Sequence, residues 1–382
     1  MRITDFELFQ VGPNWQFLRV GTDAGIVGWG EPIIEGRAST VAAAVSEAFE
    51  YLIGLDPLRI EDHWQTLGRS QFYNGGAIAQ AALAGIDQAL WDIAGKSYGQ
   101  PVHALLGGHV RDRVRAYAQV HGDTLPELAD EAAAAVGRGM TAVKIAPAAG
   151  PLDTFASPAQ IRDVVDRVST VRATIGGDVD LAVDFHGKLA PADAIRVLRH
   201  LADFGLLFAE EPIAPEHEHA LKAVIESTAI PIAAGERRYS RAEFDPLLRA
   251  GLGVAQPDPS HAGGISEVRR IGALAEMFGV PLAPHCPLGP IALASALHLD
   301  FAVPNFLLQE QLIHSSYGAR TGFLSLVEDP AVFEMEDGHF ALPLGPGLGV
   351  QIDEEAVRHA SRSPHDWRIP LLRKPDGSRA PW

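Results

Sequence analysis

The chain has almost no cysteine, no long apolar run and no excess of basic residues. Its single cysteine, Cys286, excludes an internal disulfide and suits a reducing cytoplasm. The first residues lack the apolar core of a signal peptide, so no export is expected. The longest apolar tract, residues 291–303, contains His298 and Asp300 and is too short and too polar to span a membrane. We therefore expect a cytoplasmic protein without a membrane segment.

Acidic residues outnumber basic ones: the chain has 31 lysines and arginines and 48 aspartates and glutamates, so its net charge is −17. This balance argues against nucleic acid or an anionic membrane as a partner. An anionic small molecule would need a local cationic site. The 382 residues, 47% of them hydrophobic, suit one barrel of about 250 residues with a smaller companion domain.

Three short apolar runs in the middle of the chain each end in a carboxylate. The carboxylates are Asp184, Glu210 and Glu236, and 26 residues separate each from the next. That spacing is about one strand, one helix and their loops, so the three would stand at the same ends of consecutive parallel strands, about 4.8 Å apart. A hard divalent cation would relieve their repulsion, and Mg²⁺ fits best. The alternative, that each acid only caps the next helix, does not explain the repeated spacing.

The N-terminal part of the chain has the pattern of an α+β domain. We expect strands at 3–11, 16–21 and 26–31 and helices at about 39–53, 58–68 and 78–97. Gly107 and Gly108 break the last pattern and indicate a domain boundary. The predicted parts are a capping domain at 1–110, a barrel at 111–330 and a C-terminal segment at 331–382 that packs back on the cap.

After residue 114, strand-like runs alternate with amphipathic helices, which is typical of a parallel sheet with crossover helices. Eight such strands would close into a TIM-type barrel, whose active site lies at the carboxyl ends of the strands. Six of the eight end in Asp, Glu or His. The predicted strands end near Val120, Ala146, Asp184, Glu210, Glu236, Asp258, His285 and Glu310.

Two histidines are candidates for acid–base chemistry. His186 follows Asp184 by two residues, so on a strand both side chains would face the barrel mouth. It could be a metal ligand, a general acid or a solvated loop residue. Asp258 and His285 end adjacent strands, and a carboxylate that fixes one imidazole nitrogen makes the other more basic. This pair is predicted to be an oriented general base, with a purely structural pair as the alternative.

The remaining strand ends add charge. Lys144 offers a positive charge to an anionic substrate, whereas Ala146, which faces the same way, offers no chemistry. Glu310 is predicted to keep its proton and donate a hydrogen bond, because other carboxylates crowd it. Glu211 follows Glu210 and faces the other way, so we expect it to be a structural partner at the barrel edge.

Beyond these residues, several motifs resemble the enolase superfamily, in its mandelate racemase-like group. They are Trp29-Gly30-Glu31-Pro32, Ile86-Asp87-Gln88-Ala89-Leu90-Trp91-Asp92-Ile93, Asp184-Phe185-His186-Gly187, Gly235-Glu236-Arg237, Gln256-Pro257-Asp258, Ser260-His261-Ala262-Gly263-Gly264, His285-Cys286-Pro287-Leu288-Gly289-Pro290 and Gln309-Glu310-Gln311. The resemblance runs over nearly the whole chain. It implies an α/β fold, a modified (β/α)7β TIM barrel with an N-terminal α+β capping domain that the C-terminal segment completes.

The resemblance also implies roles for the site residues. Asp184, Glu210 and Glu236 would bind Mg²⁺. His285 with Asp258 would abstract the proton α to a carboxylate, and His186 would protonate a departing 3-hydroxyl. Lys144 and Glu310 are counted with the catalytic residues, and substrate contacts are expected at Trp15, Tyr73, Asn74, Arg237 and His314. A homo-oligomer, either a dimer or an octamer, is implied as well.

Two departures from the family pattern bear on the reaction. Many relatives place a second lysine, a base on the opposite face, where this chain has Ala146, and its absence favours dehydration over racemisation. Residues 71–76 and 312–317, in loops that set which sugar fits, do not match residue by residue. We expect a Mg²⁺-dependent dehydratase that converts an aldonate, D-galactonate first, to a 2-keto-3-deoxy acid. A racemase or epimerase of a carboxylate and a non-catalytic metal-binding protein are the alternatives.

Overall fold

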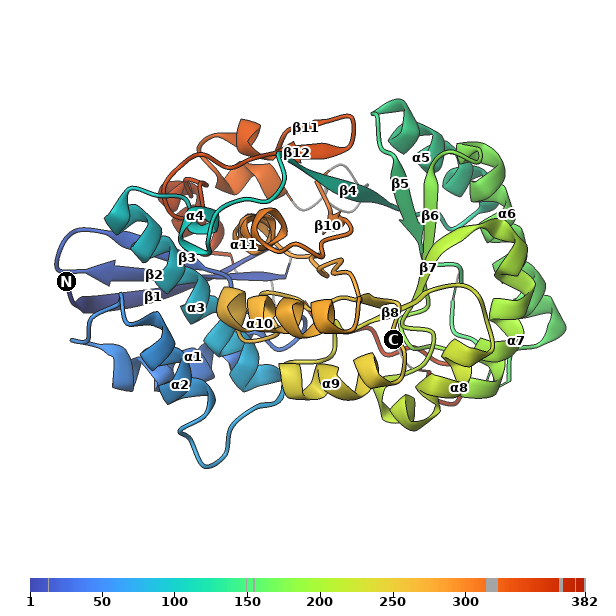
Figure 1. The fold of residues 1–382 in the computed structure, drawn as a ribbon, viewed down its shortest axis with the longest axis horizontal. Coiled ribbons are helices and arrows are strands. Elements are labelled where there is room, and N and C mark those ends of the chain that lie inside the picture. The colour runs from blue at the N-terminus through green and yellow to red at the C-terminus, as the bar shows by residue number, and fades with distance from the viewer. Residues whose placement is uncertain are drawn as a thin grey trace.

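The computed structural model describes residues 1–12, 14–148, 150–153, 155–313, 322–363, 367–374 and 376–380. The blue N-terminal strands and helices lie at one end of the molecule, and the green helices lie at the other (Figure 1). Within the described ranges, every helix is too short or too polar to serve as a membrane span.

The N-terminal part is a three-stranded antiparallel sheet covered by helices. The strands pair in the order β1-β2-β3. The elements are β1 (Ile3–Val11), β2 (Trp15–Thr22), β3 (Val27–Gly30), α1 (Ala38–Leu52), α2 (Ile60–Gly68), α3 (Gly76–Tyr98) and α4 (Val102–Leu105). Helix α3 approaches β3 so closely that a Cβ atom at Gly30 would collide with the carbonyl oxygen of Gly85. Glycine is therefore required at this contact. The three predicted strands and three predicted helices are confirmed to within a few residues.

The rest of the chain forms the predicted barrel. Its first six strands pair in parallel and in order, namely β4 (Arg113–Val120), β5 (Ala142–Ile145), β6 (Asp180–Asp184), β7 (Leu206–Glu210), β8 (Ile232–Ala234) and β9 (Val254–Ala255). The seventh strand is reduced to parallel bridges from Leu282 to Ala255 and to Phe306. The eighth, β10 (Gln309–Gln311), pairs with β4, so the pairing returns to its starting strand.

One buried cluster supports this ring of eight strands. Each of the eight positions in the ring gives it one side chain, from the strand itself or from the residue beside it, and the members are Tyr117, Ala142, Ala182, Phe208, Ala233, Val254, Ala283 and Leu308. Inward-facing residues from every strand fill the interior of a barrel in this way. The barrel helices are α5 (Leu125–Gly137), α6 (Pro158–Ile175), α7 (Pro191–Leu201), α8 (Leu221–Glu226), α9 (Arg241–Arg249), α10 (Gly264–Met277) and α11 (Pro290–Ala302), with 3₁₀ turns η1 (Ala202–Phe204) and η2 (Pro215–Ala220). The (β/α)7β architecture is confirmed.

Local sequence explains where the first two barrel helices begin. Thr124 precedes α5 and Ser157 precedes α6, and each side chain accepts a hydrogen bond from the backbone three residues on. Glu127 and Gln160 bond back to the cap residue, which completes a capping box at both sites. A proline in the first turn of each helix fixes the backbone where no intrahelical N–H is needed.

The C-terminal segment joins the barrel to the cap, as expected. The elements after the last barrel strand are η3 (Phe323–Leu326) and η4 (Pro330–Phe333), followed within the segment by β11 (Met335–Glu336), β12 (His339–Ala341) and α13 (Glu354–Ala360). Strand β12 pairs antiparallel with β4 of the barrel. Helix α13 packs on β1 of the cap, where Arg358 donates two hydrogen bonds to Glu7 at 2.7 and 2.8 Å. The domain boundaries at residues 110 and 330 stay predictions.

The Arg358→Ala substitution is expected to destabilise the protein by about 1 kcal/mol or less at pH 7, because the bidentate ion pair lies at a partly exposed site. The hydrogen bond from Arg358 lowers the pKa of Glu7 below its ordinary value of 4.5. A lowered carboxylate pKa stabilises the fold above the unfolded pKa, and this stabilisation is lost as the pH falls through the folded pKa. Thermal unfolding of variant and wild type is measured at pH 7 and at pH 3, and the difference between their melting temperatures should be smaller at pH 3. Arg362→Ala, which removes an exposed arginine, is the control and should have the wild-type melting temperature at both pH values. An unchanged difference at pH 3 would contradict the assignment to Glu7.

Candidate active site

The structure brings the three equally spaced carboxylates together at the barrel mouth. Asp184 ends β6 and Glu210 ends β7, and the two are register partners across the strands. Glu236 follows β8 by two residues, and oxygens of all three lie within 4.8 Å of one another. Gly235 between β8 and Glu236 has φ 138°, and a Cβ atom there would meet Phe244 at 2.5 Å. Glycine therefore permits the turn that carries Glu236 inward.

One lysine partly compensates these charges. Lys144 Nζ lies 2.8 Å from Glu210 Oε1, 2.9 Å from Glu310 Oε1 and 3.5 Å from Asp184 Oδ2. Burial lowers the pKa of Lys144, but Glu210 and Glu310 outweigh this and raise it well above its ordinary value. Burial, helped by neighbouring carboxylates, raises the pKa of Glu236 to about 8.

The cluster fits a divalent cation. Burial and the charge of Asp184 also raise the pKa of Glu210 well above its ordinary range, so the three carboxylates resist being ionised together without more positive charge. A hard cation such as Mg²⁺ is bound by carboxylate oxygens converging from different elements, which is the donor set found here.

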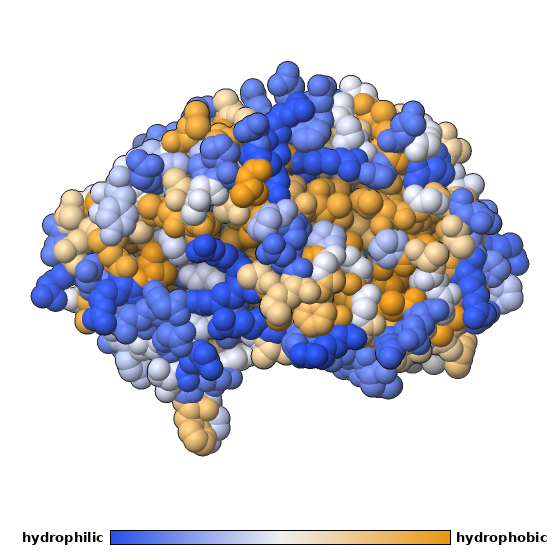
Figure 2. Space-filling model, in the orientation of Figure 1, coloured by the Kyte–Doolittle hydropathy of each residue, from blue (hydrophilic) through white to orange (hydrophobic). Residues whose placement is uncertain are grey.

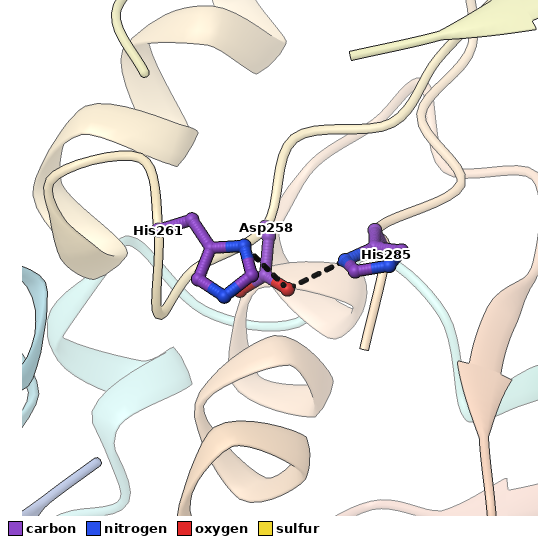
Figure 3. A group of neighbouring side chains, drawn as sticks. All are labelled: Asp258, His261 and His285. Carbon is purple, nitrogen blue, oxygen red and sulfur yellow. Dashed lines mark hydrogen bonds and ion pairs between the residues drawn. The ribbon is translucent and has the colours of Figure 1, made fainter. Parts of the chain in front are cut away.

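A histidine–aspartate pair, His285 and Asp258, lies near the cluster, and Figure 3 shows how the two side chains meet. His285 Nδ1 lies 2.7 Å from Asp258 Oδ2, and the backbone N–H of Ser260 donates to Asp258 Oδ1 at 2.6 Å. Because Asp258 accepts a hydrogen bond from Nδ1, the other ring nitrogen, Nε2, is free to accept a proton. Nε2 lies 3.8 Å from Glu236 Oε2. Burial lowers the pKa of His285, but Glu310, Glu236 and Asp258 outweigh it and raise the pKa well above the ordinary value.

His186 reaches the cavity by a different route from the one predicted. We predicted that His186 faces the barrel mouth because it lies two residues after Asp184 on one strand. That reasoning is wrong, because strand β6 ends at Asp184 and His186 lies beyond it. Instead, His186 has a left-handed backbone with φ 50°, and its N–H donates to Asp184 Oδ1 at 2.9 Å. The ring Nε2 lies 3.1 Å from Asp184 Oδ2. Asp184 raises the pKa of His186, but burial together with Lys188 and Lys144 lowers it overall.

The expectation that Glu310 keeps its proton is wrong. Its carboxylate accepts from three donors in the described part of the chain: Gln119 Nε2 at 2.5 Å, Lys144 Nζ at 2.9 Å and the backbone N–H of Cys286 at 2.8 Å. Burial raises the pKa of Glu310, but Lys144 and His285 lower it to about 2. The positive charges of Lys144 and His285, which come from other strands, outweigh the effect of the neighbouring carboxylates on the pKa of Glu310.

The barrel mouth holds a cavity of about 470 Å³, and most of the predicted site residues line it. Among the predicted residues, it is lined by Lys144, Asp184, His186, Glu236, Arg237, His285 and Glu310. Arg237 is held there by Glu211, whose Oε2 accepts from its guanidinium at 2.5 Å, as expected of a structural partner. Glu210 is fully buried and is not among the residues that line the cavity.

The structure does not bring three predicted substrate contacts to this cavity. Trp15 is fully buried at the start of β2, where it is the register partner of Val11. Tyr73 is 92% exposed, and Asn74 donates to the carbonyls of Arg69 and Gln71 in its own loop. Gly75 and Gly76 both have positive φ and follow this loop, which Figure 2 shows standing clear of the body. The fifth prediction, His314, lies outside the described residues.

Sequence reasoning missed other lining residues. His261 lines the cavity, and its Nδ1 lies 3.5 Å from Asp258 Oδ2 (Figure 3). Glu35 enters from the cap, where it accepts a hydrogen bond from Asn14 at 3.2 Å, and Trp367 and Ile369 enter from the C-terminal segment. A histidine three residues after a strand-end aspartate was a usable signal for His261. No local pattern marks the other residues, because only the tertiary fold brings the cap and the C-terminal segment to the barrel mouth.

Fold and cavity together define a capped barrel with titratable histidines beside a carboxylate cluster whose oxygens could bind a metal ion. A family model described as "Enolase C-terminal domain-like" matches residues 127–356. A second, "Mandelate racemase / muconate lactonizing enzyme, N-terminal domain", matches residues 13–107. The chain belongs to the mandelate racemase and muconate lactonizing enzyme family of the enolase superfamily.

Curated relatives and solved structures agree with this family. A D-galactonate dehydratase of Variovorax paradoxus (strain S110) is 47% identical over 100% of both chains, and one of Xanthomonas axonopodis pv. citri (strain 306) is 46% identical over the same share. A solved enolase from Agrobacterium radiobacter, bound to Na and L-malate, is 32% identical over 100% of both chains with a TM-score of 0.90. A member of the enolase superfamily from Salmonella Typhimurium is 31% identical, with a TM-score of 0.88 over 94% of this chain and 97% of that one.

Proposed function

We propose that the protein is a Mg²⁺-dependent acid-sugar dehydratase, a carbon–oxygen lyase that converts D-galactonate to a 2-keto-3-deoxy acid. The observation that carries the proposal is one cavity that is lined by an Asp-bonded histidine, a second histidine and two members of the three-carboxylate cluster, Asp184 and Glu236. The name shared by full-length relatives at 46 and 47% identity supports the sugar acid and the reaction.

The base of the reaction is His285. Its Nε2 takes the proton α to the substrate carboxylate, while Asp258 holds Nδ1–H and stabilises the imidazolium that forms. Mg²⁺ bound by Asp184, Glu210 and Glu236 would supply positive charge as the substrate carboxylate gains electron density. Lys144, in contact with Glu210 and Glu310, adds a fixed cation at the same place.

The acid of the reaction is His186. It gives a proton to the departing 3-hydroxyl, which would otherwise leave as hydroxide. The lowered pKa of His186 makes its protonated ring a stronger acid. Arg237, fixed by Glu211, is positioned to contact the polar sugar chain.

A racemase is supported less well. Racemisation of a carboxylate needs a base on each face of the α-carbon, and Ala146, which lines the cavity near Lys144, has no titratable group. The L-malate bound by the Agrobacterium radiobacter enolase is a 2-hydroxy acid, which agrees with a substrate of this class.

The function is tested by incubating purified protein and Mg²⁺ with a panel of aldonates and measuring 2-keto acid formation. D-galactonate is expected to turn over fastest. Deuterium exchange into recovered substrate without loss of water would indicate the racemase instead, and no turnover on the whole panel would indicate a non-catalytic metal-binding protein. Assembly into a homo-oligomer and a cytoplasmic location stay predictions, and light scattering after gel filtration measures the first.

The Glu236→Gln substitution is expected to weaken Mg²⁺ binding at least about tenfold, because it removes one of three anionic ligands while keeping the side-chain volume. Calorimetric titration of Mg²⁺ measures this without any turnover. Glu216→Gln, which removes an exposed carboxylate at the start of η2, is the matched control and should bind Mg²⁺ like the wild type. Unchanged affinity in a folded Glu236→Gln variant would remove Glu236 from the ligand set.

A further inference from the structure

Two buried polar side chains of the cap reach the loops that carry the proposed base and its carboxylate. Gln88 comes from the middle of α3, and Glu31 follows β3 directly. Both are 0% exposed, as are Asp258 and Ser260 on the barrel side. Full burial of polar groups is costly unless each finds a partner, so the partners of these two side chains are informative.

Gln88 holds the loop that begins at Asp258. Its side-chain amide donates to the carbonyl oxygen of Pro259 at 3.0 Å and to Ser260 Oγ at 2.9 Å. The same Ser260 donates its backbone N–H to Asp258 Oδ1, and Asp258 Oδ2 accepts from His285. A continuous path of hydrogen bonds therefore runs from α3 of the cap to the imidazole.

Glu31 holds the loop that follows His285. Its carboxylate accepts from the backbone N–H of Gly289 at 2.7 Å and of Ala292 at 2.9 Å, where α11 begins. The backbone N–H of Glu31 donates to Gln88 Oε1 at 2.7 Å. Gln88 thus connects both loops through one amide.

We propose that Gln88 is a positioning residue for the Asp258–His285 pair, and that Glu31 completes the same clamp from the His285 side. This inference deepens the proposed function and rests on it. The cap then does more than cover the substrate, because it fixes the angle between the base and the carboxylate that orients it. A displacement of about 1 Å in such a group can cost about 10²-fold in rate.

The site requires an amide in particular. Gln88 uses its oxygen as an acceptor for Glu31 and its nitrogen as a donor to Pro259 and Ser260. A glutamate would lose the donors, and a leucine of similar size would lose donors and acceptor. Leucine therefore removes the clamp while preserving the volume of the core.

The chain offers a matched control one residue away. Asp87, also on α3, accepts hydrogen bonds from the Ser266 hydroxyl at 2.6 Å and from its backbone N–H at 3.0 Å. This contact joins cap and barrel in the same buried region, but it ends on α10 and does not touch the loop of Asp258. The Ser266 hydroxyl also accepts a hydrogen bond from Trp91 Nε1 of α3 at 3.0 Å. The Ser266→Ala substitution therefore removes two cap–barrel hydrogen bonds without removing the clamp.

The decisive comparison is Gln88→Leu against Ser266→Ala. Both variants should lose thermal stability. Only Gln88→Leu should lower kcat on the aldonate, by about 10- to 100-fold, while its KM stays within about threefold of the wild-type value. Because proton abstraction becomes slower in this variant, the primary isotope effect measured with α-deuterated substrate should rise. Equal losses of kcat in the two variants would overturn the proposal, because they would reflect general loosening of the cap.

A second measurement needs no turnover, which separates failure of this inference from failure of the proposed function. The hydrogen-bonded Nδ1 proton of His285 should give a downfield NMR resonance that is absent in His285→Asn. In Gln88→Leu this resonance should shift or broaden, and in Ser266→Ala it should stay in place. Ser260→Ala, which deletes only one acceptor of Gln88, serves if Gln88→Leu does not fold, and it should shift the resonance less. An unmoved resonance in the folded clamp variants would overturn the proposal whether or not the wild type dehydrates D-galactonate.

Discussion

The His285→Asn variant is expected to lose dehydration by about 10⁴-fold and to lose exchange of the α-proton with solvent to the same extent. Asparagine can still donate an N–H to Asp258, so the strand end and the neighbouring carboxylates should keep their places. Its amide nitrogen is not basic, however, and cannot take a proton near neutral pH. Both reactions begin with the same abstraction, and they should therefore fall together.

The exchange is measured by NMR as loss of the α-proton signal of the aldonate in D₂O with Mg²⁺ present. His217→Asn, on η2 away from the cavity, is the control and should exchange at the wild-type rate. His261 is the competing assignment, since its Nδ1 lies 3.5 Å from the same oxygen of Asp258. If exchange persisted in His285→Asn and disappeared in His261→Asn, the base would be His261.

The barrel could be predicted because its pattern repeats along the chain. Strand and helix follow each other with a regular period, and the carboxylates Asp184, Glu210 and Glu236 fall at equivalent points of three consecutive units. Parallel strands then bring these points together whatever the side-chain packing, because their carboxyl ends share one edge. The pairing of Asp258 with His285 follows from the same geometry.

Three features of the site could not be predicted from the repeating strand and helix pattern. His186 faces the cavity through a left-handed turn, which strand alternation cannot predict. The ionisation of Glu310 depends on Lys144 and Gln119, which come from other strands, so counting nearby acids in the sequence gives the wrong sign. Trp367 reaches the cavity from a segment that follows the last barrel strand by more than fifty residues, and only tertiary packing can place it.

The His186→Asn variant is expected to lose dehydration by about 10² to 10⁴-fold, or about 3 to 5 kcal/mol, while it still exchanges the α-proton through His285. Asparagine tolerates the left-handed backbone at φ 50° and keeps the N–H that bonds to Asp184, so the turn should survive. What the substitution removes is the acid for the leaving hydroxyl. A calorimetric Mg²⁺ titration with wild-type affinity serves as the control for an intact metal site.

A change of leaving group isolates that role. Fluoride at C3 needs less protonation to leave than hydroxide does, so the 3-fluoro analogue should recover elimination in His186→Asn more than in the wild type. The recovery is measured as the ratio of fluoride release to 2-keto acid formation from the natural substrate. A variant that dehydrates the hydroxy acid at nearly the wild-type rate, or that gains nothing from fluoride, would contradict the assignment. Lys144, the cation that already contacts Glu210 and Glu310 at the same wall of the cavity, would then be the next residue to test as the acid.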